Sequence, residues 1–224
     1  MPELRIGGLS RLSSCDWPGE LVATVFCQGC SWRCPYCHNP DLLPATGKSS
    51  IPWEEVRAFL ATRRNLLDAV VFSGGEPLLQ QALSEAMRDA SAMGFKIGLH
   101  TGGAVSSRFA EVLPLVDWVG FDVKAPFDDY ARITGIDGSG RHARESLIAL
   151  LASGVANEVR TTVHPRLLGP GILDQMAHEL AGLGVVCWVL QAFRGRSTTS
   201  LAPEPYEEDM LGTLKQCIAQ VEWR

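Results

Sequence analysis

The chain of 224 residues is long enough to bury a substantial core, and 46% of its residues are hydrophobic against 20% that are charged. Its formal net charge of −5 gives no sign of the basic surface that binds nucleic acids or anionic membranes. No apolar run is as long as a membrane span, and the N-terminus lacks the apolar core of a signal peptide. We therefore expect a cytoplasmic globular protein with neither a nucleic acid nor a membrane as partner.

Short apolar segments alternate with helical patterns along the chain, in an order that predicts six strand–helix units. Pro52 opens the first helix, because proline suits a first helical turn. The expected strands are residues 21–27, 69–72, 96–100, 118–123, 158–163 and 185–191. The expected helices are residues 52–64, 78–93, 106–113, 141–153, 172–183 and 207–221, and residues 194–205 are expected to form a loop.

Alternating strands and helices of this length predict an α/β fold with a parallel sheet and right-handed crossovers. Six units are two fewer than a closed eight-stranded barrel needs. The pattern therefore favours an open, partial (β/α)6 barrel, and a doubly wound sheet is the alternative. No repeat or linker divides the sequence, so we expect a single domain over residues 1–224.

The cysteines form an unlikely disulfide framework, because there are seven of them and four lie within eleven residues. In a reducing compartment such crowding indicates metal binding. The crowded cysteines are Cys27, Cys30, Cys34 and Cys37. Cys187, in an apolar run, and Cys217, in a helical pattern, are expected to be packing residues without chemistry.

Three kinds of metal site fit the crowded cysteines. Two Cys-x2-Cys pairs could bind zinc, although only three residues separate them. All four thiols could hold a ferredoxin-like cluster, or Cys30, Cys34 and Cys37 alone could hold a [4Fe–4S] cluster with one open iron. The pattern favours the last, because Cys27 fits the end of a strand, where its side chain can point into the core.

Polar or glycine-rich segments follow each expected strand. The carboxyl ends of parallel strands meet at one edge of a sheet, where ligands of α/β folds bind. Together these segments predict one ligand site. They are the cysteine run and residues 73–77, 100–103, 122–126, 164–166 and 191–194.

Several side chains in these segments have both a structural and a functional interpretation. Glu76 follows two glycines that allow a close backbone approach to a ligand, and it is either a helix-start charge or an anchor for an ammonium group. Asp122 and Lys124 alternate along a strand and so point to the same side, as site residues or as a buried ion pair. Three histidines are expected to be hydrogen-bonded structural residues rather than metal ligands: His38, His100 and His164.

The three-cysteine run and the Gly-Gly-Glu-Pro run at residues 74–77 together resemble the radical S-adenosylmethionine (SAM) superfamily. The longer run over residues 28–40, Gln-Gly-Cys-Ser-Trp-Arg-Cys-Pro-Tyr-Cys-His-Asn-Pro, is similar to glycyl-radical-enzyme activating proteins. Within that group it looks most like the activators of anaerobic ribonucleoside-triphosphate reductase. Residues 118–126 and 158–165 support this subgroup, and the resemblance covers almost the whole chain.

The resemblance implies one [4Fe–4S] cluster and SAM as cofactors. Cys30, Cys34 and Cys37 would hold the cluster, and SAM would chelate its fourth iron. The implied SAM contacts are Tyr36 against the adenine, Gly74, Gly75 and Glu76 at the methionine ammonium, Thr101, Asp122 and Lys124 near the ribose and carboxylate, Gln191 or Phe193 beside the adenosine, and His38 among the cofactor-binding residues.

The implied activity is reductive cleavage of SAM to methionine and a 5′-deoxyadenosyl radical, with flavodoxin or ferredoxin as the electron donor. The radical would take a hydrogen atom from a glycine of a partner enzyme, anaerobic ribonucleotide reductase by this resemblance. Two alternatives stay open: a radical SAM enzyme acting on a small molecule, such as a 7-deazaguanine precursor synthase, and a non-catalytic iron–sulfur or zinc module.

The sequence departs from the family pattern in two places. Relatives often carry Asp-Thr-Asn-Gly where this chain has His100-Thr-Gly-Gly, so the monovalent-cation site that the aspartate serves in some activators is not expected here. Cys27 is an additional thiol that the family motif does not require. No further cysteine-rich insertion is present, so a second cluster is not expected.

Overall fold

A computed structural model describes residues 3–46, 50–193 and 207–224, and the strands in these ranges form a single eight-stranded sheet. The strand order in the sheet is the order in the sequence, from β1 to β8. The antiparallel pair is β1 with β2, and every later neighbouring pair is parallel. The strands are β1 (Ile6–Ser13), β2 (Val22–Cys27), β3 (Ala69–Gly74), β4 (Lys96–Thr101), β5 (Trp118–Asp122), β6 (Ala156–Val163), β7 (Cys187–Ala192) and β8 (Gln220–Trp223).

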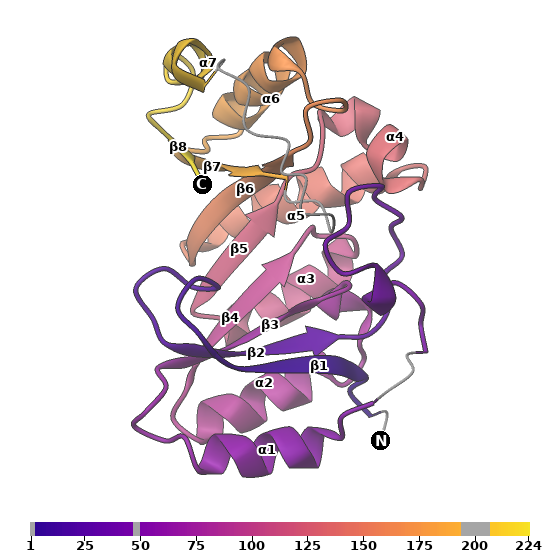
Figure 1. Ribbon diagram of the computed structural model, residues 1–224, viewed down its shortest axis with the longest axis vertical. Coiled ribbons are helices and arrows are strands. Elements are labelled where there is room, and N and C mark those ends of the chain that lie inside the picture. The colour runs from indigo at the N-terminus through magenta and orange to yellow at the C-terminus, as the bar shows by residue number, and fades with distance from the viewer. Residues whose placement is uncertain (1–2, 47–49, 194–206) are drawn as a thin grey trace.

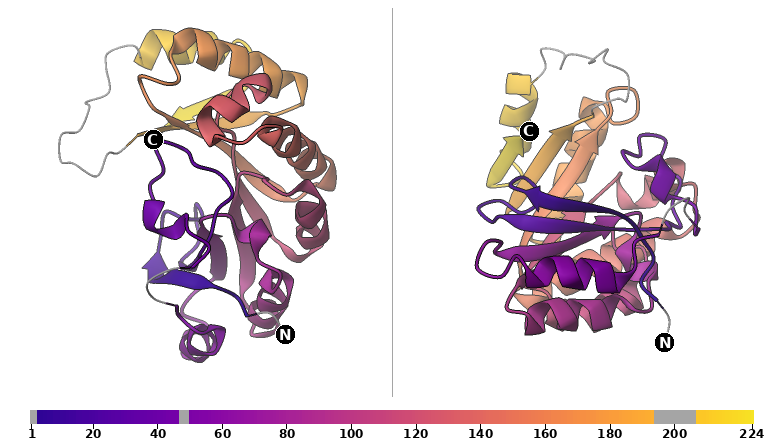
Figure 2. Two further views of the ribbon diagram at one scale, coloured as in Figure 1. Left: turned by 90° about the vertical axis from the view of Figure 1, so that its right-hand side faces the viewer. Right: turned by 60° about the horizontal axis from the view of Figure 1, so that its bottom comes forward.

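Helices connect the parallel strands and flank the outer side of the curved sheet (Figures 1 and 2). The loop that follows β2 lies on the inner side of the sheet. The helices are α1 (Trp53–Ala61), α2 (Leu83–Ala92), α3 (Ser106–Val112), α4 (Tyr130–Thr134), α5 (Ser139–Ser153), α6 (Pro170–Gly182) and α7 (Glu207–Leu214). Single 3-10 turns cover Pro40–Leu42, Pro77–Leu79, Leu113–Leu115 and Phe127–Asp129.

The prediction of an open partial barrel is confirmed. β1 and β8 are the two edges of the sheet, so the described strands do not close into a barrel. The alternative of a doubly wound sheet is wrong, because such a sheet reverses its strand order at a switch point and the order here is sequential. The six predicted strands correspond to β2 through β7.

The structure corrects the prediction at both edges of the sheet. β1 was not expected, because its two glycines and its exposed residues hide the strand pattern and only pairing with β2 defines it. The helix predicted over residues 207–221 ends at Leu214, and β8 follows it. Val221 is the buried residue of β8, and its neighbours in that strand are exposed or half-buried, so pairing with β7 decides this segment.

Two further differences concern helices. The helix predicted from residue 78 begins at Leu83, because Glu76 and Pro77 first form a separate 3-10 turn in which the Glu76 side chain accepts a hydrogen bond from the Leu78 amide. The short helix α4 was not expected; it ends at Gly135, whose φ of 70° is left-handed. The loop predicted over residues 194–205 lies outside the described residues.

The main core lies between the sheet and its helices. Phe72, Leu99 and Phe121 from the central strands are fully buried, together with Met87 of α2 and Leu147 of α5. Burial of each such side chain stabilises the fold by roughly 1.5–3 kcal/mol, so the strand ends that carry the site have a rigid support. Within the described ranges, no helix is both long and apolar enough to cross a membrane.

Candidate functional site

The cysteine loop after β2 is fixed by backbone hydrogen bonds. The Gly29 amide donates to the Leu42 carbonyl at 2.7 Å, and the Cys30 amide donates to the Leu43 carbonyl at 3.1 Å. The buried Gln28 side chain donates to the Pro44 carbonyl at 2.7 Å. These contacts close residues 28–44 into a compact loop, so its thiols have defined positions.

The Gly-Gly-Glu segment after β3 carries this loop. The Gly75 amide donates to the Cys27 carbonyl and the Glu76 amide to the Gly29 carbonyl, each at 2.9 Å. A Cβ on Gly74 would lie 2.5 Å from the Cys27 nitrogen, and one on Gly75 would lie 2.3 Å from the Gly29 oxygen. These two glycines therefore allow the backbone of their segment to approach the cysteine loop closely. Both glycines also line the cavity described next.

A cavity of about 480 Å³ opens at the carboxyl ends of the parallel strands. Its lining includes Cys30, Cys34 and Cys37. Burial, and next the charge of Glu76, raise the pKa of Cys30 to about 12, and burial raises the pKa of Cys34. Thiols in such surroundings are stable when protonated, and a bound cation would be needed to hold them as thiolates.

Cys27 is separate from the other three crowded cysteines. It ends β2, is fully buried in the main core, and is absent from the cavity lining. Burial raises the pKa of its thiol well above the usual range. The prediction that Cys27 points into the core is confirmed, and the two Cys-x2-Cys pairs do not form one site.

The Glu76 carboxylate is the most deeply buried acidic group in the cavity lining, with 2% of the residue exposed. It accepts hydrogen bonds from the Thr101 hydroxyl at 2.7 Å, the Leu78 amide at 3.1 Å and the Gly102 amide at 3.2 Å. Burial raises the pKa of Glu76 despite these donors. A positively charged ligand group beside it would favour the ionised carboxylate and be attracted to it.

Asp122 and Lys124 both line the cavity, as their alternation at the end of β5 predicts. Their side chains form an ion pair with 3.7 Å between Nζ and Oδ2. Asp122 also accepts from the guanidinium of Arg160 at 2.9 Å. Burial opposes ionisation of Asp122, but the charges of Arg160 and Lys124 outweigh it and lower its pKa. Lys124 lies 5.8 Å above the ring of Trp32, another lining residue.

His100 is a hydrogen-bonded structural histidine, as predicted. Its Nε2 lies 2.6 Å from the Asp16 carbonyl oxygen, which can only accept, so Nε2 carries the proton. Its Nδ1 then accepts from the Ser73 hydroxyl at 3.3 Å. Burial, and next the charge of Arg160, lower the pKa of His100 to about 4. The ring is therefore neutral at physiological pH.

Aromatic rings gather at one side of the cavity. Tyr36 is buried and its hydroxyl donates to the Lys124 carbonyl at 3.3 Å. Phe193 stacks on His38 with centroids 5.9 Å apart, and it contacts His164 at 4.7 Å. Tyr36 and His38 line the cavity, whereas Phe193, which stacks on His38, is not in the lining.

The structure brings most of the predicted site residues into one cavity. Thr101 and Phe193 are the two that do not line it. The predicted residues in the lining are Cys30, Cys34, Tyr36, Cys37, His38, Gly74, Gly75, Glu76, Asp122, Lys124 and Gln191.

Several residues that line the cavity were not predicted from the sequence. Glu158, Arg160 and Thr162 occupy alternate positions of β6 and all face the cavity. This polar alternation was a signal that could have identified them. Cys15 and Asp16, in the turn before β2, also line the cavity, and no local pattern marks them.

Comparison with known proteins decides the family. The Radical SAM superfamily model matches residues 24–183, more than half of the chain. This chain belongs to the radical SAM superfamily. It is a radical SAM oxidoreductase with relatives among glycyl-radical enzyme activating enzymes.

Two of these relatives show the extent of the similarity. A Methanocaldococcus jannaschii protein named as a glycyl-radical enzyme activating enzyme is 31% identical over 77% of this radical SAM chain and 73% of the relative. The pyruvate formate-lyase-activating enzyme of Clostridium pasteurianum is 32% identical over 73% of this chain and 70% of the relative.

A solved structure shows the same fold. SuiB of Streptococcus suis, bound to S-adenosylmethionine, superposes with a TM-score of 0.65 at 10% identity. The alignment covers 88% of this chain but only 48% of SuiB, so this radical SAM chain spans about half the length of that protein.

The residues present fit the cofactors that the superfamily implies, a [4Fe–4S] cluster and SAM. Three cysteine side chains from one loop line the same cavity as a buried carboxylate. An aspartate and a lysine at the carboxyl end of β5, Asp122 and Lys124, line this cavity as well. Thiolates suit iron–sulfur clusters, and paired charges of both signs suit a zwitterionic ligand.

Proposed function

We propose that this protein is an activating enzyme that uses a [4Fe–4S] cluster and SAM to generate a glycyl radical on a partner enzyme, and that residues 1–224 act as a single radical SAM domain. The convergence of Cys30, Cys34, Cys37 and Glu76 on one cavity carries the proposal. Sequence identity of 31% to a named glycyl-radical enzyme activating enzyme supports it.

The cluster would be held by Cys30, Cys34 and Cys37. When bound and given one electron by an external donor, the two cofactors would supply methionine and a 5′-deoxyadenosyl radical, which can abstract a hydrogen atom from a glycine. Cys27 takes no part, because it is buried in the core away from the cavity. The position of Cys27 gives no support to the alternative of a ferredoxin-like cluster held by all four crowded cysteines.

The charged groups would orient SAM by its two amino-acid charges. The buried Glu76 carboxylate, next to Gly74 and Gly75, would bind the methionine ammonium. Lys124 would bind the SAM carboxylate, because its ion pair to Asp122 is 3.7 Å long, whereas Arg160 holds Asp122 at 2.9 Å. Asp122 would then border the ribose.

Thr101 would act through Glu76, because its hydroxyl donates to that carboxylate at 2.7 Å and it does not line the cavity. The adenosine would lie toward the aromatic side of the cavity. Tyr36, His38 and Gln191 line that part, and Phe193 supports His38 by stacking.

The cavity wall is suited to a reactive radical. Trp32 and Tyr36 are 3% and 5% exposed, so two large rings shield the thiols from water on that side. A primary alkyl radical would otherwise react with solvent-exposed groups, and exclusion of water limits such side reactions.

The partner that we propose is an anaerobic ribonucleotide reductase, on the strength of the sequence run at residues 28–40. The names of the relatives make pyruvate formate-lyase the competing candidate. Flavodoxin or ferredoxin would donate the electron. An enzyme acting on a small molecule and a binding module without catalysis are the two outcomes that would replace this proposal.

Product analysis separates these outcomes. The reconstituted protein is incubated anaerobically with SAM and a low-potential reductant, with each candidate partner and without one, and 5′-deoxyadenosine and methionine are measured. We expect cleavage that requires the cluster, is absent in Cys34→Ala, and rises when the correct partner is added. If protein that carries a reduced cluster does not cleave SAM, the binding module without catalysis is the hypothesis that remains.

A further inference from the structure

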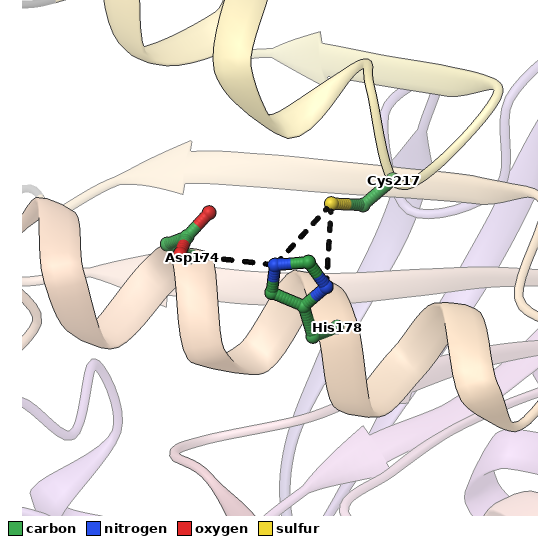
Figure 3. Close-up of side chains that lie close together, drawn as sticks. All are labelled: Asp174, His178 and Cys217. Atoms are coloured by element: carbon green, nitrogen blue, oxygen red, sulfur yellow. Dashed lines mark hydrogen bonds and ion pairs between the residues drawn. The ribbon is translucent and has the colours of Figure 1, made fainter.

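Three potential metal ligands converge on the outer helical layer, away from the cavity. Asp174 and His178 are four residues apart on α6 and so lie on one face of that helix. Cys217 lies in the turn between α7 and β8. Figure 3 shows the three side chains pointing toward one another from these two segments. None of them lines the cavity.

The distances between the three side chains are short. Sγ of Cys217 lies 3.6 Å from Nδ1 and 3.8 Å from Nε2 of His178. Nε2 of His178 lies 3.9 Å from Oδ2 of Asp174. One ligand atom from each residue lies within 4.8 Å of the others. Tetrahedral zinc with ordinary bond lengths separates such ligands by about 3.3–3.6 Å, so shifts of less than about 1 Å would bring them to its coordination distances.

The backbone holds Cys217 in this position. The Cys217 and Ile218 amides both donate to the Leu214 carbonyl at 3.0 Å. Leu214 and Ile218 are each 1% exposed and anchor the turn in the core on both sides of the cysteine. The fold therefore holds the backbone of Cys217 next to α6, and its thiol lies against His178.

We propose that Asp174, His178 and Cys217 form a binding site for one zinc ion, with a water molecule as the fourth ligand. A thiolate and an imidazole select zinc over magnesium or calcium, which prefer oxygen ligands alone. The ion would tie the turn before β8 to α6 and so fasten the last strand of the sheet. The expectation that Cys217 has no chemistry would then be wrong.

The chain offers a matched comparison. His142 on α5 lies 3.8 Å from the carboxylate of Glu145, three residues later, so it forms the same kind of histidine–carboxylate pair without a thiol. Cys187 is a half-buried cysteine outside the cluster. His142→Ala and Cys187→Ser therefore remove one residue of each type without touching the proposed site.

The test is a zinc titration of the anaerobically reconstituted protein against a competing chromophoric chelator. In this form the cluster would occupy Cys30, Cys34 and Cys37, so these three thiols do not compete for zinc, and Cys187→Ser controls for a cysteine outside both sites. We expect one zinc per chain. The affinity should fall at least tenfold in His178→Ala and in Cys217→Ser, and at least threefold in Asp174→Asn. His142→Ala and Cys187→Ser should bind as the parent does.

Two further readouts separate a metal site from a simple contact. Cobalt(II) in place of zinc should give a thiolate charge-transfer absorption in the parent and none in Cys217→Ser. Zinc should raise the thermal midpoint of the parent but not that of His178→Ala, because only the parent binds it in the folded state. Iron content and the zinc-free thermal midpoint verify that each variant folds. If the parent binds zinc no more tightly than Cys217→Ser, the Cys217–His178 contact is only a hydrogen bond and the proposal is wrong.

Discussion

The hydroxyl of Thr101 donates to the carboxylate of Glu76 at 2.7 Å and joins the ends of two neighbouring strands, β4 and β3. The same carboxylate accepts from the backbone of both segments, at the Leu78 and Gly102 amides. Its position in the cavity is therefore fixed before a ligand arrives. Preorganisation of this kind lowers the cost of binding, which makes Glu76 the first residue to test.

Glu76→Gln should weaken SAM binding while the cluster survives. The loss of a carboxylate facing an ammonium costs on the order of 1–3 kcal/mol, as for other hydrogen bonds to charged groups. Thr101→Val keeps the shape and removes one donor to Glu76, so its effect should have the same sign and be smaller. Anaerobic calorimetric titration with SAM measures both. Unchanged affinity in Glu76→Gln would make Glu76 only the capping residue of its turn.

Cys34→Ala should abolish the cluster, and Cys27→Ala should keep it. A three-thiolate site with about four irons per chain depends on each of its ligands, whereas Cys27 is fully buried in the core and outside the cavity. Iron and sulfide content after anaerobic reconstitution tests this. A stable cluster in Cys34→Ala, or a cluster lost from Cys27→Ala at full folding, would overturn the ligand assignment.

Arg160→Met should destabilise the protein by about 2 kcal/mol. The Arg160 side chain is 9% exposed and holds the Asp122 carboxylate at 2.9 Å, so its removal takes away the nearest hydrogen-bonded partner of a carboxylate that is itself two-thirds buried. Arg57→Met removes a half-exposed arginine that pairs with Glu54 and Asp89, and it should change stability by less than about 1 kcal/mol. Urea denaturation compares the two. Equal losses of stability in the two variants would show that the Arg160–Asp122 pair stabilises the protein no more than the exposed pairs of Arg57.

Stability of the cluster-free protein should fall as the pH is lowered from about 6.5 to about 4. The pKa of His100 is lowered to about 4 in the folded state, so in this window the unfolded chain binds a proton that the folded chain does not. The slope from this residue approaches about 1.4 kcal/mol per pH unit. His100→Gln keeps a donor for the Asp16 carbonyl and removes the titration. Urea midpoints measured over this range should show a shallower slope in that variant, and identical slopes would contradict the neutral assignment of His100.

The sequence predicts the inner strands and the site far better than the edges of the sheet. β2 through β5 carry β-branched or apolar runs that are buried on both sides, as Val70, Val71 and Phe72 show. Parallel strands of this kind are recognisable from composition alone. β1 and β8 are defined by pairing with β2 and β7, and their own residues are exposed or mixed.

The same distinction holds within the site. The cysteine loop and the Gly-Gly-Glu segment are local in sequence, so their spacing is sufficient to recognise them. Arg160 reaches Asp122 from a different strand, and Asp16 reaches His100 from a turn 84 residues away. Such contacts depend on strand register, which the sequence does not display. The docking of Gly75 against Gly29 is likewise visible only in three dimensions.

The formation of a glycyl radical on the partner is the most direct test of the proposed function. The reconstituted protein, SAM, a low-potential reductant and an anaerobic ribonucleotide reductase are mixed without oxygen, and electron paramagnetic resonance is recorded; a pyruvate formate-lyase is tested in parallel. We predict a glycine-centred doublet on one of these enzymes that is missing when Cys30, Cys34 or Cys37 is replaced. Ready SAM cleavage with no radical on any glycyl radical enzyme of the same cell, together with conversion of a small molecule, would contradict the activating role.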